Sequence, residues 1–205
     1  MQLTEREKLE LSRLLIKTNA LKFGIFKLTS GKMSPYYIDL RMIPSFPDAF
    51  KKVVSLYKQI INSQVPDFKR IAGVPTAGIP FSSVVAYELQ KPFIYTRKEA
   101  KQHGRERLVE GYLTPGDKIL VIDDLATTGK SSREAVEAIR KEGGIVTDLV
   151  VLIDRLEGAQ ENMQEIEVTL HSVISIAEVT EELYNSGVIN NEQYNQIVRQ
   201  HASSV

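Results

Sequence analysis

The strongest constraint on the fold is the stretch 119–132, which reads Ile-Leu-Val-Ile-Asp-Asp-Leu-Ala-Thr-Thr-Gly-Lys-Ser-Ser. The apolar run from Ile119 to Ile122 is typical of a strand that is covered on both faces of a parallel sheet. From Ser131 onward the pattern changes to helical spacing. A strand, a short loop and a helix in this order predict an α/β fold. Such sheets bind ligands beyond the carboxyl ends of their strands, so the loop is a candidate site.

This loop has the composition of a phosphate-binding site. Free backbone N–H groups and the positive end of a helix dipole are expected there, beside the hydroxyls of Thr127, Thr128 and Ser131. Asp123 and Asp124 would repel a phosphate, so they indicate a ligand with further groups. Carboxylates accept hydrogen bonds from vicinal hydroxyls and bind magnesium. A sugar phosphate meets both demands.

Two other interpretations fit the stretch less well. Gly129-Lys130-Ser131 is similar to the end of a triphosphate-binding loop, but that motif needs a glycine where this chain has Asp124. The two aspartates could instead cap a helix, although caps usually employ a single Asp, Ser or Thr. The whole stretch 119–132 resembles the diphosphoribosyl-binding motif of the type I phosphoribosyltransferases.

The rest of the chain predicts one α/β domain. Thr4 and Glu7 have capping-box spacing, which predicts a first helix that ends near Asn19. Asp48 is expected to cap a second helix. Strand and helix patterns then alternate, which predicts a central parallel sheet flanked by helices. The expected strands are 70–73, 92–96, 118–122, 148–153 and one within 165–176, and the later helices are 79–90, 131–142, 177–186 and 191–200.

Composition excludes some classes of function. The chain has 205 residues, with 26 Lys and Arg against 26 Asp and Glu, so its formal net charge is zero. This balance gives no reason to expect a nucleic-acid or membrane partner. Cysteine is absent, which excludes disulfides and thiolate chemistry and fits a reducing compartment. The charged N-terminus and the lack of a long apolar run predict a cytoplasmic protein.

A second segment that is rich in charged residues lies at 97–107. Basic residues outnumber acidic residues there, and no apolar periodicity is present. Taken alone, such a run could simply be a solvated surface. The preceding strand is expected to end at the same edge of the sheet as Asp123, so the segment is predicted to be a lid over the phosphate site. A phosphate site and a separate cationic lid match 5-phosphoribosyl diphosphate. Arg97, Lys98, Lys101 and His103 would then stabilise the departing pyrophosphate, with magnesium neutralising further charge.

Further motifs narrow the resemblance. The segments 21–24 (Leu-Lys-Phe-Gly), 30–39 (Ser-Gly-Lys-Met-Ser-Pro-Tyr-Tyr-Ile-Asp) and 97–104 are similar to those of the orotate phosphoribosyltransferases. The resemblance implies a type I phosphoribosyltransferase fold with an N-terminal helix and hood at 1–45, whereas 177–205 are interpreted as packing helices. It implies transfer of phosphoribose to orotate, giving orotidine 5′-monophosphate and pyrophosphate in pyrimidine biosynthesis. It also implies a Mg²⁺ requirement and a homodimer in which loop 97–107 acts in the neighbouring subunit.

Site residues are carried over by motif position. The resemblance implies that orotate is bound by Thr127, Arg155, Tyr36 and Tyr37, and a guanidinium suits the carboxylate of orotate. Alternation along a strand also predicts that one of the two tyrosines packs in the core. The residues implied for catalysis are Lys101, His103, Asp123 and Asp124. The residues implied for binding the phosphoribosyl donor are Arg97, Lys98, Lys101, His103, Asp123, Asp124, Leu125, Ala126, Thr127, Thr128, Gly129, Lys130 and Ser131. Magnesium is expected to be held mainly by the substrate, near Asp123 and Asp124.

The chain departs from the family pattern at two positions. Many relatives have a lysine where this chain has Thr29, and another where it has Ala77. More of the diphosphate binding is therefore expected from Lys98, Lys101 and the backbone N–H groups of 74–78. Two alternative functions remain at this stage: a phosphoribosyltransferase for another base, and a regulator that binds phosphoribosyl diphosphate without chemistry.

Overall fold

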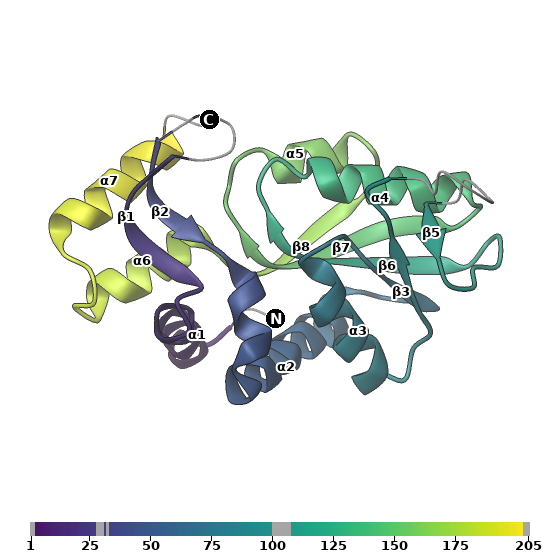
Figure 1. Ribbon diagram of the computed structural model, residues 1–205, viewed down its shortest axis with the longest axis horizontal. Helices are drawn as coiled ribbons and strands as arrows, with labels where there is room; N and C mark the ends of the chain where they lie inside the picture. The colour runs from purple at the N-terminus through teal and green to yellow at the C-terminus, as the bar shows by residue number, and fades with distance from the viewer. Residues whose placement is uncertain (1–2, 28–30, 32, 100–107, 203–205) are drawn as a thin grey trace.

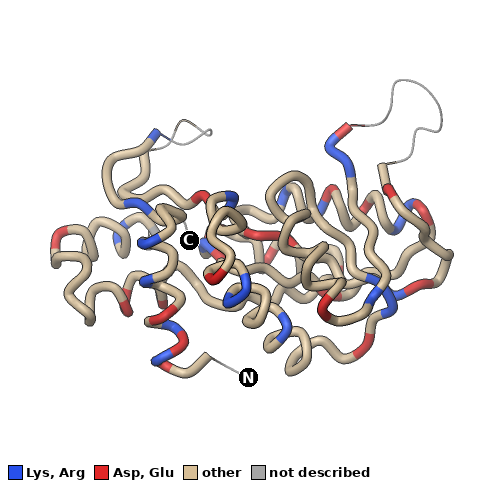
Figure 2. Tube along the Cα trace, turned by 60° about the horizontal axis from the view of Figure 1, so that its bottom comes forward, with Lys and Arg blue, Asp and Glu red and all other residues tan. Residues whose placement is uncertain are grey.

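A computed structural model describes residues 3–27, 31, 33–99 and 108–202 of the chain. These residues form a large part built on a six-stranded sheet and a smaller part built on a two-stranded sheet (Figure 1). Acidic and basic residues are interspersed over both parts (Figure 2). Within the described residues, no helix combines the length and the apolar character that a membrane crossing requires.

The central sheet has the strand order β5-β4-β3-β6-β7-β8. Every neighbouring pair is parallel except β4 and β5. The predicted parallel sheet is therefore confirmed, with one antiparallel edge strand that the sequence pattern did not reveal. The strands are β3 (Arg70–Gly73), β4 (Phe93–Thr96), β5 (Val109–Glu110), β6 (Lys118–Ala126), β7 (Ile145–Asp154) and β8 (Thr169–Ser175).

Helices cover both faces of this sheet (Figure 1). The helices α2 (Pro47–Gln64) and α3 (Gly78–Glu88) lie on one face, while α4 (Lys130–Lys141) and α5 (Ala159–Gln164) lie on the other. The strand β6 alternates between two hydrophobic clusters, because side chains along a strand point to opposite faces. Leu120 and Ile122 pack in the cluster of α2 and α3, whereas Ile119 and Val121 pack in the cluster of α4 and α5.

The smaller part, which we call the hood, combines both ends of the described chain. It contains β1 (Leu21–Lys27), β2 (Met33–Ile38), α1 (Glu5–Lys17), α6 (Ile176–Asn185) and α7 (Asn191–Ala202), and Figure 1 shows the purple and yellow segments side by side. The helix α6 packs on α1, and α7 packs on β2. The hydroxyl of Ser34 donates to Gln200 Oε1 at 3.2 Å. A 3-10 helix, η1 (Leu40–Ser45), then leads from β2 to α2.

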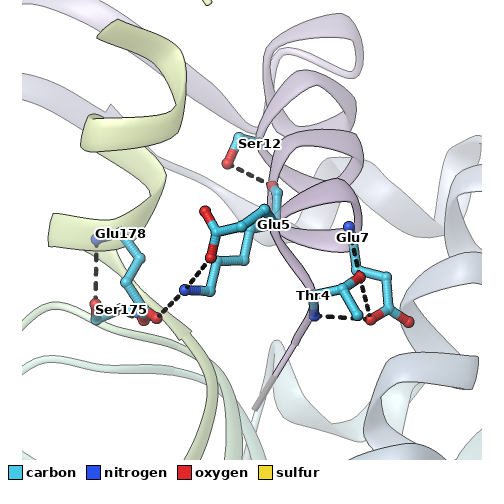
Figure 3. A network of polar contacts seen from close by, with 7 residues as sticks. Thr4, Glu5, Glu7, Ser12, Ser175 and Glu178 are labelled. Carbon is cyan, nitrogen blue, oxygen red and sulfur yellow. Dashed lines mark hydrogen bonds and ion pairs between the residues drawn. The ribbon is translucent and has the colours of Figure 1, made fainter. Parts of the chain in front are cut away.

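Polar contacts hold α1 and α6 together (Figure 3). Each helix begins with a capping box, formed by Thr4 with Glu7 and by Ser175 with Glu178. Lys8 Nζ lies 3.3 Å from Glu5 Oε1 and 3.2 Å from Glu178 Oε1. The predicted capping box at Thr4 is confirmed. The same motif at Ser175 satisfies the free N–H groups at the start of α6.

Several predicted boundaries were wrong. The prediction that Asp48 caps α2 was wrong, because Phe46 is the N-cap and Pro47 begins the helix. Proline is favoured at a first helical position, since its missing N–H has no partner there in any case. The strand β6 does not end at Ile122 but continues to Ala126, because its final residues still pair with β7. The helix α5 was not predicted at all.

Candidate active site

A cleft of about 360 Å³ lies at the carboxyl end of the central strands. The turn that follows β3, the end of β6 and the start of α4 form one side of it. The end of β2 and the start of η1 form the other. The described residues that line it are Ile38, Asp39, Leu40, Arg41, Pro75, Thr76, Ala77, Lys98, Asp123, Asp124, Leu125, Thr127, Thr128, Gly129, Lys130, Ser131 and Ser132.

The loop between β6 and α4 has the geometry of an anion-binding site. Gly129 is the N-cap of α4 with φ +76°, a left-handed conformation that glycine adopts without strain. A Cβ at this position would lie 3.1 Å from Met163 Cε. Asn162 Nδ2 donates to Thr128 O at 2.8 Å and ties the loop to α5. The loop thus presents hydroxyls and the N-terminus of α4 to the cleft, as a phosphate site requires.

The two aspartates have different surroundings. Asp123 Oδ1 accepts a hydrogen bond from the N–H of Asp124 at 2.9 Å, and Oδ2 accepts from Ser132 Oγ at 3.1 Å. The backbone oxygen of Asp123 accepts from the phenol of Tyr57 at 2.7 Å. A Cβ added at Gly78 would lie 2.8 Å from Asp123 Oδ1, so only glycine allows α3 to start this close to β6. Asp123 therefore links β6 to α2 and α4, and its carboxylate lies close to the start of α3.

Burial raises the pKa of the Asp123 carboxyl well above its usual range, and the charge of Asp124 raises it further. Burial also raises the pKa of Asp124. Successive strand residues face opposite sides of a sheet. The side chain of Asp123 lies toward α4, where it meets Ser132. Asp123 is thus held by hydrogen bonds within the protein, and both aspartates line the cleft.

An ion pair forms part of the opposite wall. Arg41 Nε lies 2.6 Å from Asp39 Oδ1, and Arg41 Nη2 lies 2.8 Å from Asp39 Oδ2. The backbone N–H of Arg41 also donates to Asp39 Oδ1 at 3.2 Å. This pairing holds the pKa of Asp39 below its ordinary value. Neither residue was predicted to be a site residue, although a charged pair directly after an extended segment was a visible signal.

The turn at 74–78 offers backbone groups to the cleft and carries no charged side chain. The N–H of Val74 donates to Ile122 O at 3.1 Å, which extends the register of β3 and β6 beyond their ladder. Pro75, Thr76 and Ala77 then line the cleft. The peptide bond between Pro75 and Thr76 is cis. No side-chain charge lies on this turn, in accordance with the alanine noted at position 77.

Two cations predicted for the lid fall among the described residues. Lys98 lines the cleft. Arg97 instead forms an ion pair with Glu110 Oε1 of β5 at 3.0 Å. Both residues also line a neighbouring cavity of about 600 Å³ between β4 and α4. Lys101 and His103, together with Thr29, lie outside the described residues.

The residues implied for orotate lie partly apart from this cleft. Thr127 lines it, but Tyr36, Tyr37 and Arg155 do not. Tyr36 is fully buried, which confirms that one of the two tyrosines packs in the core, whereas Tyr37 is 37% exposed. The guanidinium of Arg155 lies 5.0 Å from the centre of the Tyr36 ring, and its Nη2 lies 2.8 Å from Glu157 Oε1.

Arg155 is linked to the end of β6 through the backbone. The N–H of Arg155 donates to the oxygen of Ala126 at 2.9 Å. Ala126 is itself buried and does not line the cleft, unlike its neighbours Leu125 and Thr127. The structure therefore brings Tyr36 of β2 together with Arg155, which follows β7, outside the residues that line the cleft.

Comparison with known proteins agrees with this geometry. Residues 41–185 match the phosphoribosyl transferase domain family, and the chain belongs to that family. An orotate phosphoribosyltransferase of Sulfolobus acidocaldarius is 45% identical over 85% of this chain and 87% of its own length. One from Cenarchaeum symbiosum is 40% identical over 91% of this chain and 94% of its own. Within the family, the chain thus groups with the orotate phosphoribosyltransferases.

Solved structures show the same fold. Orotate phosphoribosyltransferase from Aeropyrum pernix matches with a TM-score of 0.75 at 32% identity, covering 84% of this chain and 98% of that one. UMP synthase of Leishmania donovani matches with a TM-score of 0.87 at 32% identity. That match covers 96% of this chain but 42% of the larger enzyme.

Proposed function

We propose that this protein transfers the 5-phosphoribosyl group from phosphoribosyl diphosphate to orotate, giving orotidine 5′-monophosphate and pyrophosphate in pyrimidine biosynthesis. The observation that carries the proposal is the cleft of about 360 Å³ in which Asp124 adjoins the loop 127–131 at the start of α4. A carboxylate beside an anion site suits a ligand that joins hydroxyls to a phosphate. The orotate phosphoribosyltransferases among the relatives supply the identity of the base.

Each part of the donor has a complementary part of the cleft. The 5′-phosphate is bound by backbone N–H groups and hydroxyls of 127–131, where the dipole of α4 favours an anion. The ribose hydroxyls donate to Asp124. The diphosphate lies against the turn 75–77 and Lys98. Breaking the bond to pyrophosphate leaves positive charge on the ribose and negative charge on the leaving group, and fixed charges at both places lower the barrier.

Magnesium fits this site best as an ion that enters with the diphosphate. Among the described residues, no group of three or more His, Asp or Glu side chains is arranged to hold a metal. Asp123 and Asp124 both line the cleft, but both oxygens of Asp123 already accept hydrogen bonds from the protein. Mg²⁺ would neutralise part of the leaving-group charge. Asp124 would be a candidate protein ligand for the ion.

Lys101 and His103 complete the catalytic assignment by family resemblance, as cations of a loop 97–107 that closes over the pyrophosphate. We propose that this loop acts in the neighbouring subunit of a homodimer. Mixing a Lys101→Ala protein with an Arg155→Ala protein tests the arrangement, because a mixed dimer then contains one site free of both substitutions. Verified mixed dimers with no recovered activity would contradict this arrangement.

We also propose a cytoplasmic location, since the chain lacks cysteine.

Orotate is assigned to Thr127, Tyr36, Tyr37 and Arg155. Arg155 is paired with Glu157 at 2.8 Å, so the carboxylate of orotate would have to share or replace that partner. A planar guanidinium can form two parallel hydrogen bonds with a carboxylate, which distinguishes orotate from uracil. The pairing with Glu157 keeps the guanidinium oriented while the site is empty.

The decisive assay is release of pyrophosphate from phosphoribosyl diphosphate, measured with orotate, uracil or a purine base, each with and without Mg²⁺. We expect turnover with orotate and loss of that turnover when the metal is chelated. Turnover of another base without turnover of orotate would identify a different phosphoribosyltransferase. Binding of the donor without turnover of any base would favour the regulator.

A further inference from the structure

One wall of the cleft has no role in the function proposed above. This wall comprises residues 38–41, at the end of β2 and the start of η1, and we call it the hood wall. It carries the ion pair between Asp39 and Arg41. A functionless surface pair would be the simplest interpretation, since Arg41 is 62% exposed and such pairs contribute little to stability.

The position of Arg41 argues for more than a surface pair. Arg41 lines the same cleft as Asp124, and the charge of Asp124 adds to that of Asp39 in raising the pKa of the guanidinium. Asp39 occupies Nε and Nη2, each with a single contact. An arginine has five N–H donors. Among the described residues, the other three donors have no hydrogen bond, on a group that Asp39 already orients.

The distribution of charge in the cleft indicates what these donors bind. Lys130, Lys98 and Arg41 are the cations among the described residues that line the cleft. Lys130 belongs to the 5′-phosphate loop. The turn 75–77 contributes no charged side chain. Once the 5′-phosphate and the ribose hydroxyls are placed, the diphosphate must lie between this turn, Lys98 and the hood wall.

We propose that Arg41 is a binding residue for the diphosphate of the phosphoribosyl donor, oriented by Asp39. The proposal rests on the function proposed above and extends it to a residue on the hood. Arg41 supplies a positive charge from the hood wall, whereas Ala77 on the opposite wall supplies none. The donor therefore bridges the hood and the central sheet.

Calorimetric titration with phosphoribosyl diphosphate, with inorganic pyrophosphate and with ribose 5-phosphate, all in the presence of Mg²⁺, tests this role without orotate. In Arg41→Ala we expect Kd for the two diphosphates to rise about 10- to 100-fold, as for loss of a hydrogen bond to a charged group. Kd for ribose 5-phosphate should change by less than about threefold, because that ligand lacks the diphosphate. The Kd of Arg41→Lys for the two diphosphates should be intermediate, since lysine retains the charge but not the paired N–H donors of a guanidinium.

Two further variants sharpen the result. Arg6→Ala removes another exposed arginine from a local ion pair, with Glu10 at 2.9 Å, and should leave all three affinities unchanged. In the double variant Arg41→Ala, Ala77→Lys, a cation on the opposite wall should recover part of the lost diphosphate affinity. Circular dichroism and unfolding midpoints within about 2 °C of wild type would exclude unfolding as the cause.

Equal affinities in wild type and Arg41→Ala would overturn the inference and leave the proposed function intact. An equal loss for ribose 5-phosphate would also overturn it, because Arg41 would then not act on the diphosphate. A wild type that binds the diphosphates through Arg41 but does not convert orotate would refute the proposed function alone. A wild type that binds no diphosphate would refute both.

Discussion

Tyr57 offers a direct test of how the hydrophobic core positions the candidate site. This tyrosine of α2 is completely buried, and its hydroxyl donates to the backbone oxygen of Asp123 at 2.7 Å. Burial raises the pKa of the phenol well above its ordinary value, so the phenol stays protonated at neutral pH and can donate this hydrogen bond. Tyr57→Phe keeps the ring and removes only this donor.

The expected cost follows from leaving a buried carbonyl without its partner. Such a loss destabilises a protein by about 1–3 kcal/mol. At about 2–4 °C per kcal/mol for a chain of this size, the unfolding midpoint should fall by about 2–12 °C. Asp124 follows the released carbonyl, so we also expect KM for phosphoribosyl diphosphate to rise. Urea unfolding followed by circular dichroism gives the free energy, and steady-state kinetics gives KM.

Tyr87→Phe is the matched control, because Tyr87 on α3 is 81% exposed and loses a hydroxyl that water already solvates. It should change the free energy of unfolding by less than about 0.5 kcal/mol. If both variants unfolded at the same urea concentration as wild type, the hydrogen bond from Tyr57 would contribute nothing and the reasoning would be wrong.

Three further predictions concern other features of the structure. Gly78→Ala places a Cβ 3.0 Å from Asp123 Cα. The resulting overpacking should lower the free energy of unfolding by about 1–3 kcal/mol and should also lower activity. A wild-type free energy of unfolding together with wild-type activity would contradict the close approach. Asp124→Asn should abolish turnover with the fold retained, whereas Asp123→Asn should also lower thermal stability, and the reverse pattern in paired assays would exchange their roles. Lys69 and then Arg70 lower the pKa of Asp117 to about 2, below its value of about 3.9 in an unfolded chain. The stability that Asp117 contributes is therefore complete above about pH 4 and is lost as the pH falls toward 2, so midpoints of Asp117→Asn should depend less on pH over this range than those of wild type.

The central sheet and the phosphate loop could be predicted because their signals are local. The apolar run before Asp123 and the helical pattern after Ser131 lie within one short stretch. The end of β6 could not be predicted, because Asp123, Asp124 and Ala126 have low strand propensity and the segment owes its strand conformation to pairing with β7. Sequence patterns record local preference, whereas this pairing depends on a distant strand.

The different surroundings of the two aspartates also could not be predicted from the sequence. Adjacent carboxylates look equivalent in a sequence, but the alternation of β6 turns Asp123 toward Ser132. Asp39 and Arg41 were missed for a related reason. The role proposed for Arg41 depends on the hood meeting the central sheet across the cleft, whereas the sequence shows only a charged pair after an extended segment.

The packing of α6 and α7 against α1 and β2 has a consequence for biosynthesis. A nascent chain that has emerged only through β8 has every strand of the central sheet, yet β2 lacks its covering helix. Contacts between segments so far apart in sequence also form slowly during folding. A ribosome-bound intermediate should therefore form the cleft in two stages, with the hood wall becoming ordered after the central sheet.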